Sequence, residues 1–336
     1  MRAMQLTHVG SLKENTAPLV LADVADPSPA AGELLLRVTA CGVCHTELDE
    51  IEGRLSPRLP VIPGHEVVGE VIELGEGVPT HFVGQRVGVG WIYSSTGEAE
   101  ENLSPDFVAT GCDVDGGYAE LMSVPAGYAY PIPDNLSDEE AAPLLCAGAI
   151  GYRALRLTGL QDGEPLGLTG FGGSGHLVLQ LARHQFPNSP VSVFARSEET
   201  RQFARRLGAD WVGETHDSPA ESLQAIIVTT PAWTPVVAAL GRLRPGGRLV
   251  INAIRKEAAD QDALLRLSYH EHLWMEREIK SVANITSRDI REFLQIAGEI
   301  PLHPTVEMYP LEEANRALRE LSSGSVRGAK VLRIRQ

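Results

Sequence analysis

The stretch GLTGFGGSGHLVLQLA, residues 167–182, places three glycines in the pattern Gly170-x-Gly172-x-x-Gly175 between a short apolar run and an amphipathic run. The first glycine of this pattern allows a tight turn after a strand, the second lets a pyrophosphate approach the backbone, and the third lets the helix pack closely on the strand. The helix that follows offers free N–H groups and a positive dipole end to phosphate. The stretch therefore predicts a dinucleotide-binding turn formed by Gly170, Gly172, Gly173 and Gly175. A glycine-rich turn without a ligand is the alternative interpretation.

Strand-like and helix-like runs alternate on both sides of this turn. They follow in the order 165–171, 175–185, 191–196, 198–208, 225–230, 233–243 and 248–254. Repeated βαβ of this kind is typical of a parallel doubly wound sheet. The earlier part of the chain instead holds short β-type runs broken by turn residues, and the tail ends in one more strand. We therefore predict an α/β protein in which a doubly wound domain, residues 148–284, is inserted into a β-rich domain formed by residues 1–147 and 285–336.

The charge of the chain narrows the classes of partner. Its 336 residues carry 44 acidic and 29 basic side chains, a formal net charge of -15, which repels nucleic-acid phosphates and anionic lipids. No apolar run approaches the roughly 18 residues that a membrane-spanning helix needs, and the first residues lack the apolar core of a signal peptide. Four cysteines are too few for a disulfide framework at this length. We expect a cytoplasmic protein that binds neither nucleic acid nor membrane.

The end of the strand after the glycine turn bears on which dinucleotide binds. Sites specific for NAD place an acidic residue about 20 residues after the glycines, where it binds the ribose 2′-hydroxyl. Here the strand ends in Ala195, Arg196 and Ser197, and Glu198 and Glu199 come one or two residues late. An arginine without an acid suits a 2′-phosphate, so Arg196 and Ser197 favour NADP over NAD.

A second group of chemically active side chains begins in CGVCHTELDEIEGR, residues 41–54. Its two cysteines and histidine fit a structural zinc clip, a redox dithiol or part of a catalytic metal site. His65 and Glu66 follow in PGHEVVGEV, residues 63–71, and Cys146 comes just before the predicted doubly wound domain. Two thiolates and one imidazole would leave zinc an open position for water or substrate.

Seven segments along the chain carry a resemblance to a known family. In order they read CGVCHTE, PGHEVVGEV, VGQRVGVGW, DGGYAE, LLCAGAIGYRAL, GFGGSGH and LRPGGRLV. With them the chain resembles, end to end, the zinc-dependent medium-chain alcohol dehydrogenases. The resemblance implies a GroES-like catalytic domain, a Rossmann cofactor domain, and hydride transfer between a small-molecule alcohol or aldehyde and a nicotinamide cofactor.

The same resemblance assigns the metal ligands. Cys44, His65 and Cys146 would hold one catalytic zinc, with Glu66 as an occasional fourth ligand, and Cys41 would pack as a core side chain. A structural clip would need a second CxxC, which the sequence lacks. A redox dithiol would usually begin a thioredoxin-like helix.

Further roles follow from the resemblance. His45 would contact the cofactor pyrophosphate, and Thr46 would hydrogen-bond the substrate oxygen and start a proton relay. Glu47 would orient the ligand histidine. The relay of many relatives ends on a histidine where this chain has Asp49. Lys330 lies next to the position of a cofactor-binding arginine in many relatives, and we expect it to contact the cofactor.

Many relatives also carry four closely spaced cysteines that bind a structural zinc in a lobe. The matching interval here, residues 92–114, holds only Cys112, and one thiol cannot form a four-cysteine site. We therefore expect one zinc per chain, and a loop anchored by burial of Pro105, Phe107 and Val108.

Two other classes of function remain as alternatives. One is a zinc-free reductase of the same superfamily, such as a quinone reductase, and the full set of zinc ligands argues against it. The other is a non-catalytic nucleotide or metal sensor, and Thr46 beside those ligands argues against that.

The resemblance also implies association between copies of the chain. Relatives associate through the edge of the cofactor-domain sheet. The apolar stretch GGRLVINAI, residues 246–254, would form an edge strand that needs cover. We expect a homodimer or homotetramer.

Overall fold

The computed structural model describes residues 1–300, 302–324 and 328–334, and the chain divides into two compact units. The first unit comprises Met1–Ala149 and Ile285–Gln336, and the second comprises Ile150–Asn284. The first division falls at 149/150, where the sequence indicated 147/148, and lies inside the helix α3 (Ala147–Thr158). The chain returns to the first unit at residue 285.

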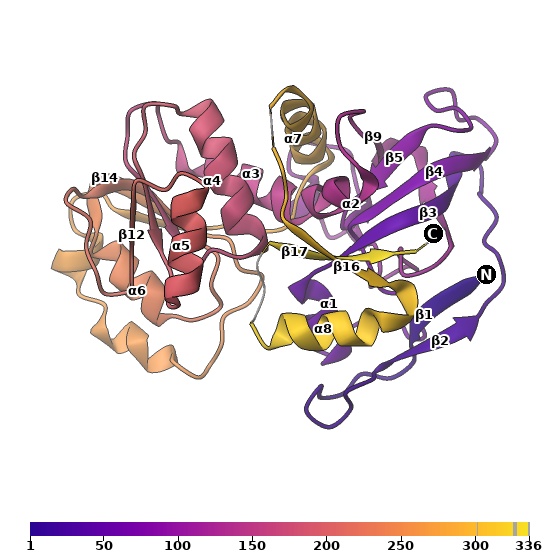
Figure 1. Ribbon diagram of the computed structural model, residues 1–336, viewed down its shortest axis with the longest axis horizontal. Coiled ribbons are helices and arrows are strands. Elements are labelled where there is room, and N and C mark those ends of the chain that lie inside the picture. The colour runs from indigo at the N-terminus through magenta and orange to yellow at the C-terminus, as the bar shows by residue number, and fades with distance from the viewer. Residues whose placement is uncertain (301, 325–327, 335–336) are drawn as a thin grey trace. The chain divides into compact units, whose positions relative to one another are not determined.

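The first unit is built on a mostly antiparallel sheet with strand order β16-β17-β3-β4-β5-β9, in which β8 also pairs with β3. Strand β3 is buried along nearly its whole length because it has neighbours on both sides and is rich in apolar and β-branched residues. Strand β17 pairs with β3, so segments from opposite ends of the sequence lie side by side (Figure 1). The elements of this unit, including the strands of the sheet, are β1 (Arg2–Leu6), β2 (Leu19–Asp23), β3 (Glu33–Val43), α1 (His45–Ile51), β4 (Val67–Leu74), β5 (Arg86–Val89), β6 (Ile92–Ser94), η1 (Glu101–Leu103), β7 (Val108–Ala109), β8 (Leu121–Pro125), η2 (Ala126–Tyr128), β9 (Ala129–Pro131), α2 (Asp138–Ala141), η3 (Ala142–Leu145), α7 (Ser287–Glu299), β16 (Val306–Pro310), η6 (Leu311–Glu313), α8 (Ala314–Ser322) and β17 (Ala329–Arg333).

The second unit is a parallel sheet with strand order β12-β11-β10-β13-β14-β15. Strands β10 and β11 are buried at every position, as expected when helices cover both faces of a sheet. The strand order reverses between β10 and β13, and ligands of such sheets bind at this switch point. The predicted α/β class with a doubly wound parallel sheet is confirmed. The elements of this unit are β10 (Leu166–Thr169), α4 (Gly173–Gln185), β11 (Val191–Phe194), α5 (Glu198–Arg206), β12 (Trp211–Gly213), β13 (Leu223–Val228), α6 (Thr234–Leu240), β14 (Leu243–Ile251), η4 (Gln261–Arg266), η5 (Tyr269–Leu273) and β15 (Glu278–Ser281).

The edge of this sheet is not the strand that the sequence indicated. Strand β14 lies between β13 and β15, so the expectation that residues 246–254 form an edge strand is wrong. The edge strand beside β14 is β15, with the sequence EIKS, and all four of its residues are exposed. A strand this short and polar leaves no alternating pattern that the sequence could reveal.

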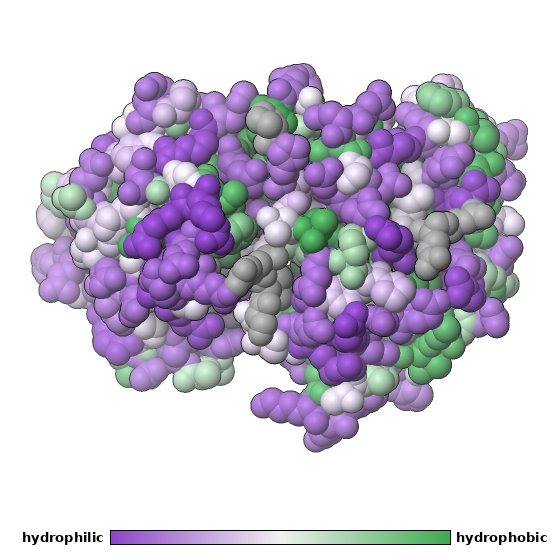
Figure 2. All heavy atoms as spheres, viewed as in Figure 1, coloured by the Kyte–Doolittle hydropathy of each residue, from purple (hydrophilic) through white to green (hydrophobic). Residues whose placement is uncertain are grey.

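The surface is polar, in keeping with the charge of the chain. The face shown in Figure 2 is mainly hydrophilic, and its hydrophobic side chains lie in small separate groups. None of the described helices is long and apolar enough to cross a membrane.

A buried carboxylate anchors the loop of residues 92–114. Oε1 of Glu101 accepts hydrogen bonds from N and from Oγ of Ser287, both at 2.6 Å. Its Oε2 accepts from the hydroxyl of Tyr128 at 3.0 Å and from N of Gly97 at 3.2 Å. Because Ser287 begins α7, the carboxylate also faces the positive end of a helix. Two of these four hydrogen bonds fasten the loop to α7, one joins it to Tyr128, and one lies within the loop.

The expected apolar anchors contribute less. Pro105 is exposed, and Phe107 and Val108 are half-buried, whereas Glu101 is only 1% exposed. Charged side chains are rarely buried without partners, and the partners of Glu101 lie far away in the sequence. The burial of Glu101 therefore could not be predicted from the loop sequence alone.

Replacing the anchor should destabilise the protein. We expect Glu101→Ala to lower the free energy of unfolding by about 3 kcal/mol, because each hydrogen bond to a charged group contributes roughly 1.5 to 3 kcal/mol. The exposed neighbour Glu100 is the control, and Glu100→Ala should change stability by less than about 0.5 kcal/mol. Denaturant unfolding of both variants measures the difference. Equal effects of the two substitutions, or loss of hydrogen-exchange protection in this loop when a chelator is added to the wild type, would contradict the assignment.

Candidate functional site

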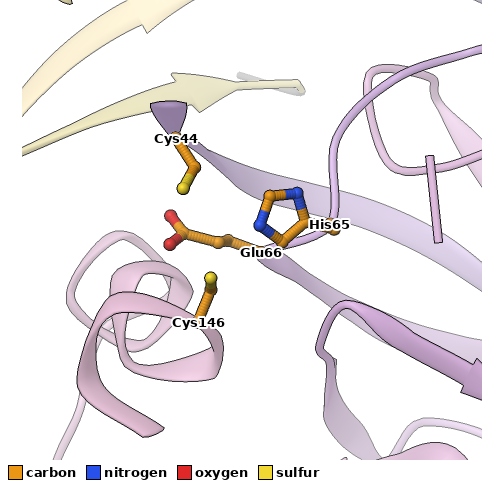
Figure 3. A group of neighbouring side chains, drawn as sticks. All are labelled: Cys44, His65, Glu66 and Cys146. Carbon is orange, nitrogen blue, oxygen red and sulfur yellow. The ribbon is translucent and has the colours of Figure 1, made fainter. Parts of the chain in front are cut away.

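Four side chains with metal-binding atoms converge in the first unit. They are Cys44, His65, Glu66 and Cys146, and one ligand atom from each lies within 4.8 Å of all the others. Figure 3 shows the two sulfur atoms, the imidazole and the carboxylate pointing toward one another. They come from three segments, namely the end of β3, the residues before β4 and the turn between η3 and α3.

The pairing of β3 with β4 brings the first two segments together. N of Gly42 donates a hydrogen bond to O of Glu66 at 2.9 Å, and Cys41 is opposite Val67 in the register. A Cβ on Gly42 would lie only 1.7 Å from Oε2 of Glu66. Glycine is thus required between the two cysteines, because the carboxylate occupies the space of a side chain.

A carboxylate fixes the orientation of the histidine. Oε1 of Glu47 lies 2.6 Å from Nδ1 of His65, and both side chains are fully buried. Oε2 of Glu47 accepts a hydrogen bond from N of Cys44 at 2.7 Å. Nε2 of His65 is buried and has no hydrogen-bond partner among the described residues. The ring therefore presents Nε2 to the cluster as an available ligand atom.

The cysteines differ in how readily they lose a proton. A hydrogen bond from Cys146 lowers the pKa of Cys44, overcoming the cost of burial with help from His65, to well below its usual range. The same contact raises the pKa of Cys146. Burial raises the pKa of Cys41 well above its usual value and that of Cys112 to about 12. These contacts favour the thiolate form at Cys44, whereas burial favours the protonated thiol at Cys41 and Cys112.

The donor set fits zinc. Tetrahedral zinc sites use thiolate sulfur, imidazole nitrogen and carboxylate oxygen, with ligand atoms roughly 3.3 to 3.8 Å apart for bonds of about 2.0 to 2.3 Å. The four ligand atoms here are close enough to reach that geometry through small side-chain movements. Oε1 of Glu66 also accepts a hydrogen bond from N of Ala147 at 3.2 Å, which holds the carboxylate beside Cys146.

The residues expected to move protons lie on α1. Oγ1 of Thr46 is 3.6 Å from Sγ of Cys44, and the side chain is buried. Asp49 is also buried, and its carboxylate accepts a hydrogen bond from Nε of Arg54 at 2.5 Å. This pairing was not predicted from the sequence. His45 is exposed at the first position of the helix.

An additional buried carboxylate was missed by the sequence analysis. Glu50 is 0% exposed, and neither of its oxygens has a hydrogen-bond partner among the described residues. Burial, followed by the neighbouring charge of Glu47, raises its pKa well above the usual value. Glu50 lies four residues after Thr46 on the same face of the helix, a spacing that could have indicated its burial.

Lys330 is placed differently from the prediction. Its ammonium group donates hydrogen bonds to Glu307 at 2.7 Å, to Glu320 at 3.0 Å and to the hydroxyl of Tyr309. An ammonium has three donors, and the side chain is 1% exposed. Its donors are thus engaged within the first unit, which disfavours the expected contact with the cofactor.

In the second unit, the glycine turn joins β10 to α4. Gly170 has φ +88°, and a Cβ there would lie 2.5 Å from Oγ1 of Thr229. Gly172 precedes α4, which begins at Gly173, and a Cβ on Gly175 would lie 2.8 Å from O of Gly170. The backbone is therefore as close-packed here as a phosphate-binding turn requires.

A histidine fixes this turn. His176 is fully buried, and its Nδ1 lies 2.9 Å from O of Gly172. Because a carbonyl can only accept, Nδ1 carries the proton. The position of His176, directly after the last glycine of the pattern, could have indicated this role from the sequence.

The end of β11 is rich in arginine. Arg196 and Ser197 are exposed, and Oγ of Ser197 caps α5 by accepting from N of Thr200 at 3.2 Å. Nη1 of Arg201 donates to the carbonyls of Ala195 and Arg196, both at 2.8 Å. Arg201 was missed, although it lies four residues after Ser197 on an amphipathic helix. Hydrophilic side chains gather over α5 in Figure 2.

Comparisons with known proteins agree with this geometry. The family model of the alcohol dehydrogenase GroES-like domain matches residues 30–134. A probable alcohol dehydrogenase AdhA of Mycobacterium tuberculosis (strain CDC 1551 / Oshkosh) is 42% identical over 99% of this chain and 97% of its own length. An alcohol dehydrogenase of Geobacillus stearothermophilus is 36% identical over 94% of this chain and 96% of its own. A cinnamyl alcohol dehydrogenase structure from Sorghum bicolor superposes with a TM-score of 0.82 at 26% identity, covering 99% of this chain and 97% of that one.

These similarities extend over nearly the whole of each chain, and the fold and the clustered side chains suit them. The protein is therefore a member of the medium-chain dehydrogenase/reductase family and interconverts alcohols and carbonyl compounds.

Proposed function

We propose that this alcohol dehydrogenase depends on one zinc ion held by Cys44, His65 and Cys146. The observation that carries the proposal is the convergence of these ligand atoms with the carboxylate of Glu66, while Nε2 of His65 lacks a hydrogen-bond partner among the described residues. When bound, zinc supplies a Lewis acid that polarises the substrate oxygen and lowers the pKa of an alcohol.

The protein's own groups handle the proton. The hydroxyl of Thr46, beside Cys44, can accept the proton of the alcohol while donating its own. Asp49 is our candidate for the end of this relay, and its partner Arg54 is 35% exposed and leads toward solvent. A nicotinamide dinucleotide held at the glycine turn of the second unit would supply the hydride chemistry.

Aromatic neighbours of His65 favour an apolar substrate. The ring centroids of His65 and Trp91 are 6.0 Å apart, and Phe107 packs edge-on against Trp91 at 5.8 Å. Both aromatic side chains are half-buried, and such walls suit planar or aliphatic carbonyl compounds. The likeness to a cinnamyl alcohol dehydrogenase supports the reduction of aromatic aldehydes. A panel of aldehydes, alcohols and quinones tests this, because turnover of quinones alone would favour the zinc-free alternative and no turnover would favour a sensor.

Removal of a ligand should remove both zinc and activity. In Cys44→Ala, His65→Ala and Cys146→Ala we expect kcat/KM to fall at least about 1,000-fold, roughly 4 kcal/mol of transition-state stabilisation. Zinc should fall from one ion per chain toward none, measured by mass spectrometry of the metal content. Cys41→Ala and Cys112→Ser are the matched controls, and both should keep their zinc and most activity. Zinc lost from the Cys41 variant but kept by the Cys44 variant would overturn the ligand assignment.

We further propose that the cofactor is NADP rather than NAD. Arg196 is exposed at the end of β11, and its guanidinium has no partner among the described residues. Glu198 is the acidic residue nearest to Arg196 in the sequence. Its carboxylate forms ion pairs with Arg201 at 3.0 Å and with Arg205 at 3.2 Å. An unpaired guanidinium suits a 2′-phosphate, and the engagement of Glu198 by two arginines disfavours its binding a 2′-hydroxyl.

A change at Ser197 tests this preference. Asp and Asn are both good helix caps, so Ser197→Asp and Ser197→Asn should both keep α5 intact. Only the aspartate adds a charge that repels the 2′-phosphate. We expect kcat/KM with NADPH to fall about tenfold in the Asp variant, and to change little in the Asn variant or with NADH. A wild-type enzyme at least tenfold better with NADH would reject the proposal.

The exposed strand β15 supports association with a second copy of the chain. None of the described strands pairs with its outer edge, and its sequence is self-complementary. In an antiparallel pair centred on Ile279, Glu278 of each copy would lie opposite Lys280 of the other. Ile279 and the nearby Trp274 and Met275 are about half-exposed. We therefore propose a homodimer or homotetramer assembled through this edge.

Reversal of one charge in β15 should weaken this association. We expect Lys280→Glu, which sets like charges opposite each other, to raise the dimer dissociation constant about tenfold, and Lys280→Arg to leave it unchanged. Light scattering over a dilution series measures both. A wild-type monomer at micromolar concentration, or equal behaviour of the two variants, would end the proposal.

The state of the cysteines bears on the cellular compartment in which the protein works. All four cysteines are free thiols. Reduced thiols suit a reducing compartment, and we propose that the protein works in the cytoplasm.

A further inference from the structure

The side-chain amine of Lys256 lies in an unusual setting in the second unit. Its Nζ donates hydrogen bonds to O of Thr230 at 2.8 Å and to O of Ala232 at 3.2 Å. The side chain is half-buried, and the centroid of the Trp233 ring lies 5.6 Å from Nζ. Among the described residues, no carboxylate forms an ion pair with this amine. A half-buried lysine held by carbonyl oxygens alone is uncommon, because burial of an unpaired charge is costly.

The number of hydrogen-bond partners around Lys256 fits a neutral amine. An ammonium has three N–H donors, whereas a neutral amine has two and an unshared electron pair. Lys330 is an example of the first case, because its three donors meet two carboxylates and one hydroxyl. Lys256 matches the second case, because its two hydrogen bonds to carbonyl oxygens use both donors of an amine and leave the electron pair free to react.

The charges around Lys256 are consistent with this state. Burial lowers the pKa of Lys256 to about 8 and outweighs the nearby charge of Asp260, which raises it. The carboxylate of Asp260 accepts hydrogen bonds from two backbone N–H groups before and at the start of α6, at 3.0 and 2.7 Å. The adjacent Arg255 and Glu257 form an ion pair with each other at 3.8 Å. With a pKa of about 8, about a tenth of the amine is neutral at pH 7, against less than about 0.1% for a lysine with the ordinary pKa of about 10.4.

We propose that Lys256 is a covalent adduct site for small aldehydes, a class of compound that the enzyme's own activity produces. The electron pair of the amine attacks the carbonyl carbon and forms a C–N bond. Both amine protons then leave with the carbonyl oxygen as water, and a C=N bond remains. The imine nitrogen carries at most one N–H, so at least one of the hydrogen bonds to O of Thr230 and O of Ala232 is lost. The adduct therefore loosens the segment after β13, which packs through Thr230 on Gly170 of the glycine turn.

Trapping of the imine tests the site. The full-length protein is incubated at pH 7 with acetaldehyde and cyanoborohydride, which reduces the C=N bond to a stable amine, and its peptides are analysed by mass spectrometry. Cofactor is left out, so the result does not depend on the zinc or cofactor assignments. Lys13, which is exposed, is the internal control. We expect initial labelling of Lys256 to be at least about tenfold faster than that of Lys13, because an appreciable fraction of Lys256 is neutral at this pH. A smaller ratio would overturn the proposal.

Hydrogen exchange in the presence of acetaldehyde alone tests the consequence of the adduct, and Lys256→Arg is the matched variant. A guanidinium can still donate to two carbonyl oxygens but forms no imine. We expect the amides of residues 229–234 to exchange at least about threefold faster when acetaldehyde is added to the wild type, and to be unaffected in the variant. Dilution of the aldehyde should restore the slower exchange, because imine formation is reversible. Faster exchange in both proteins, or in neither, would contradict the release of this segment.

Discussion

The contact between Glu47 and His65 is the constraint on which the proposed metal site depends. With Nδ1 of His65 held 2.6 Å from one carboxylate oxygen, the ring can present only Nε2 to the neighbouring thiols. The other oxygen of Glu47 holds the backbone N of Cys44 at 2.7 Å. One buried side chain therefore positions two ligand-bearing segments, and the antiparallel pairing of β3 with β4 brings those segments into register. Protein contacts alone thus bring the proposed ligand atoms together.

The loop of residues 92–114 is held by hydrogen bonds to a buried carboxylate. Its anchor is the carboxylate of Glu101, which accepts two hydrogen bonds from Ser287 at the start of α7. Hydrogen bonds to a buried charge make a structure rigid when every partner is in place. The same loop carries Phe107, which packs on Trp91, and Trp91 lies beside His65. The anchor therefore also supports the aromatic wall next to the metal ligands.

The features that could be predicted from the sequence are those that a local pattern of residues encodes. The βαβ alternation and the glycines at 170, 172 and 175 were sufficient for the second unit, because their spacing reflects turn and packing geometry directly. The residues that the sequence analysis missed are fixed by partners distant in the chain or by burial. Glu101 needs Ser287, Lys330 needs Glu307 and Glu320, and neither pairing leaves a periodic signal. Strand β15 was missed for a different reason, because four polar residues are too few to show the alternation of a strand.

X-ray absorption at the zinc edge of the purified protein tests the central claim most directly, because it reports the type of ligand atoms and their distances without any substitution. The account predicts two sulfur ligands at about 2.3 Å and two lighter ligands, nitrogen or oxygen, at about 2.0 to 2.2 Å. That result would match Cys44, Cys146 and His65 with one further oxygen from Glu66, water or substrate. A shell of four sulfur atoms, or a shell with none, would contradict the assignment of this cluster as the catalytic metal site.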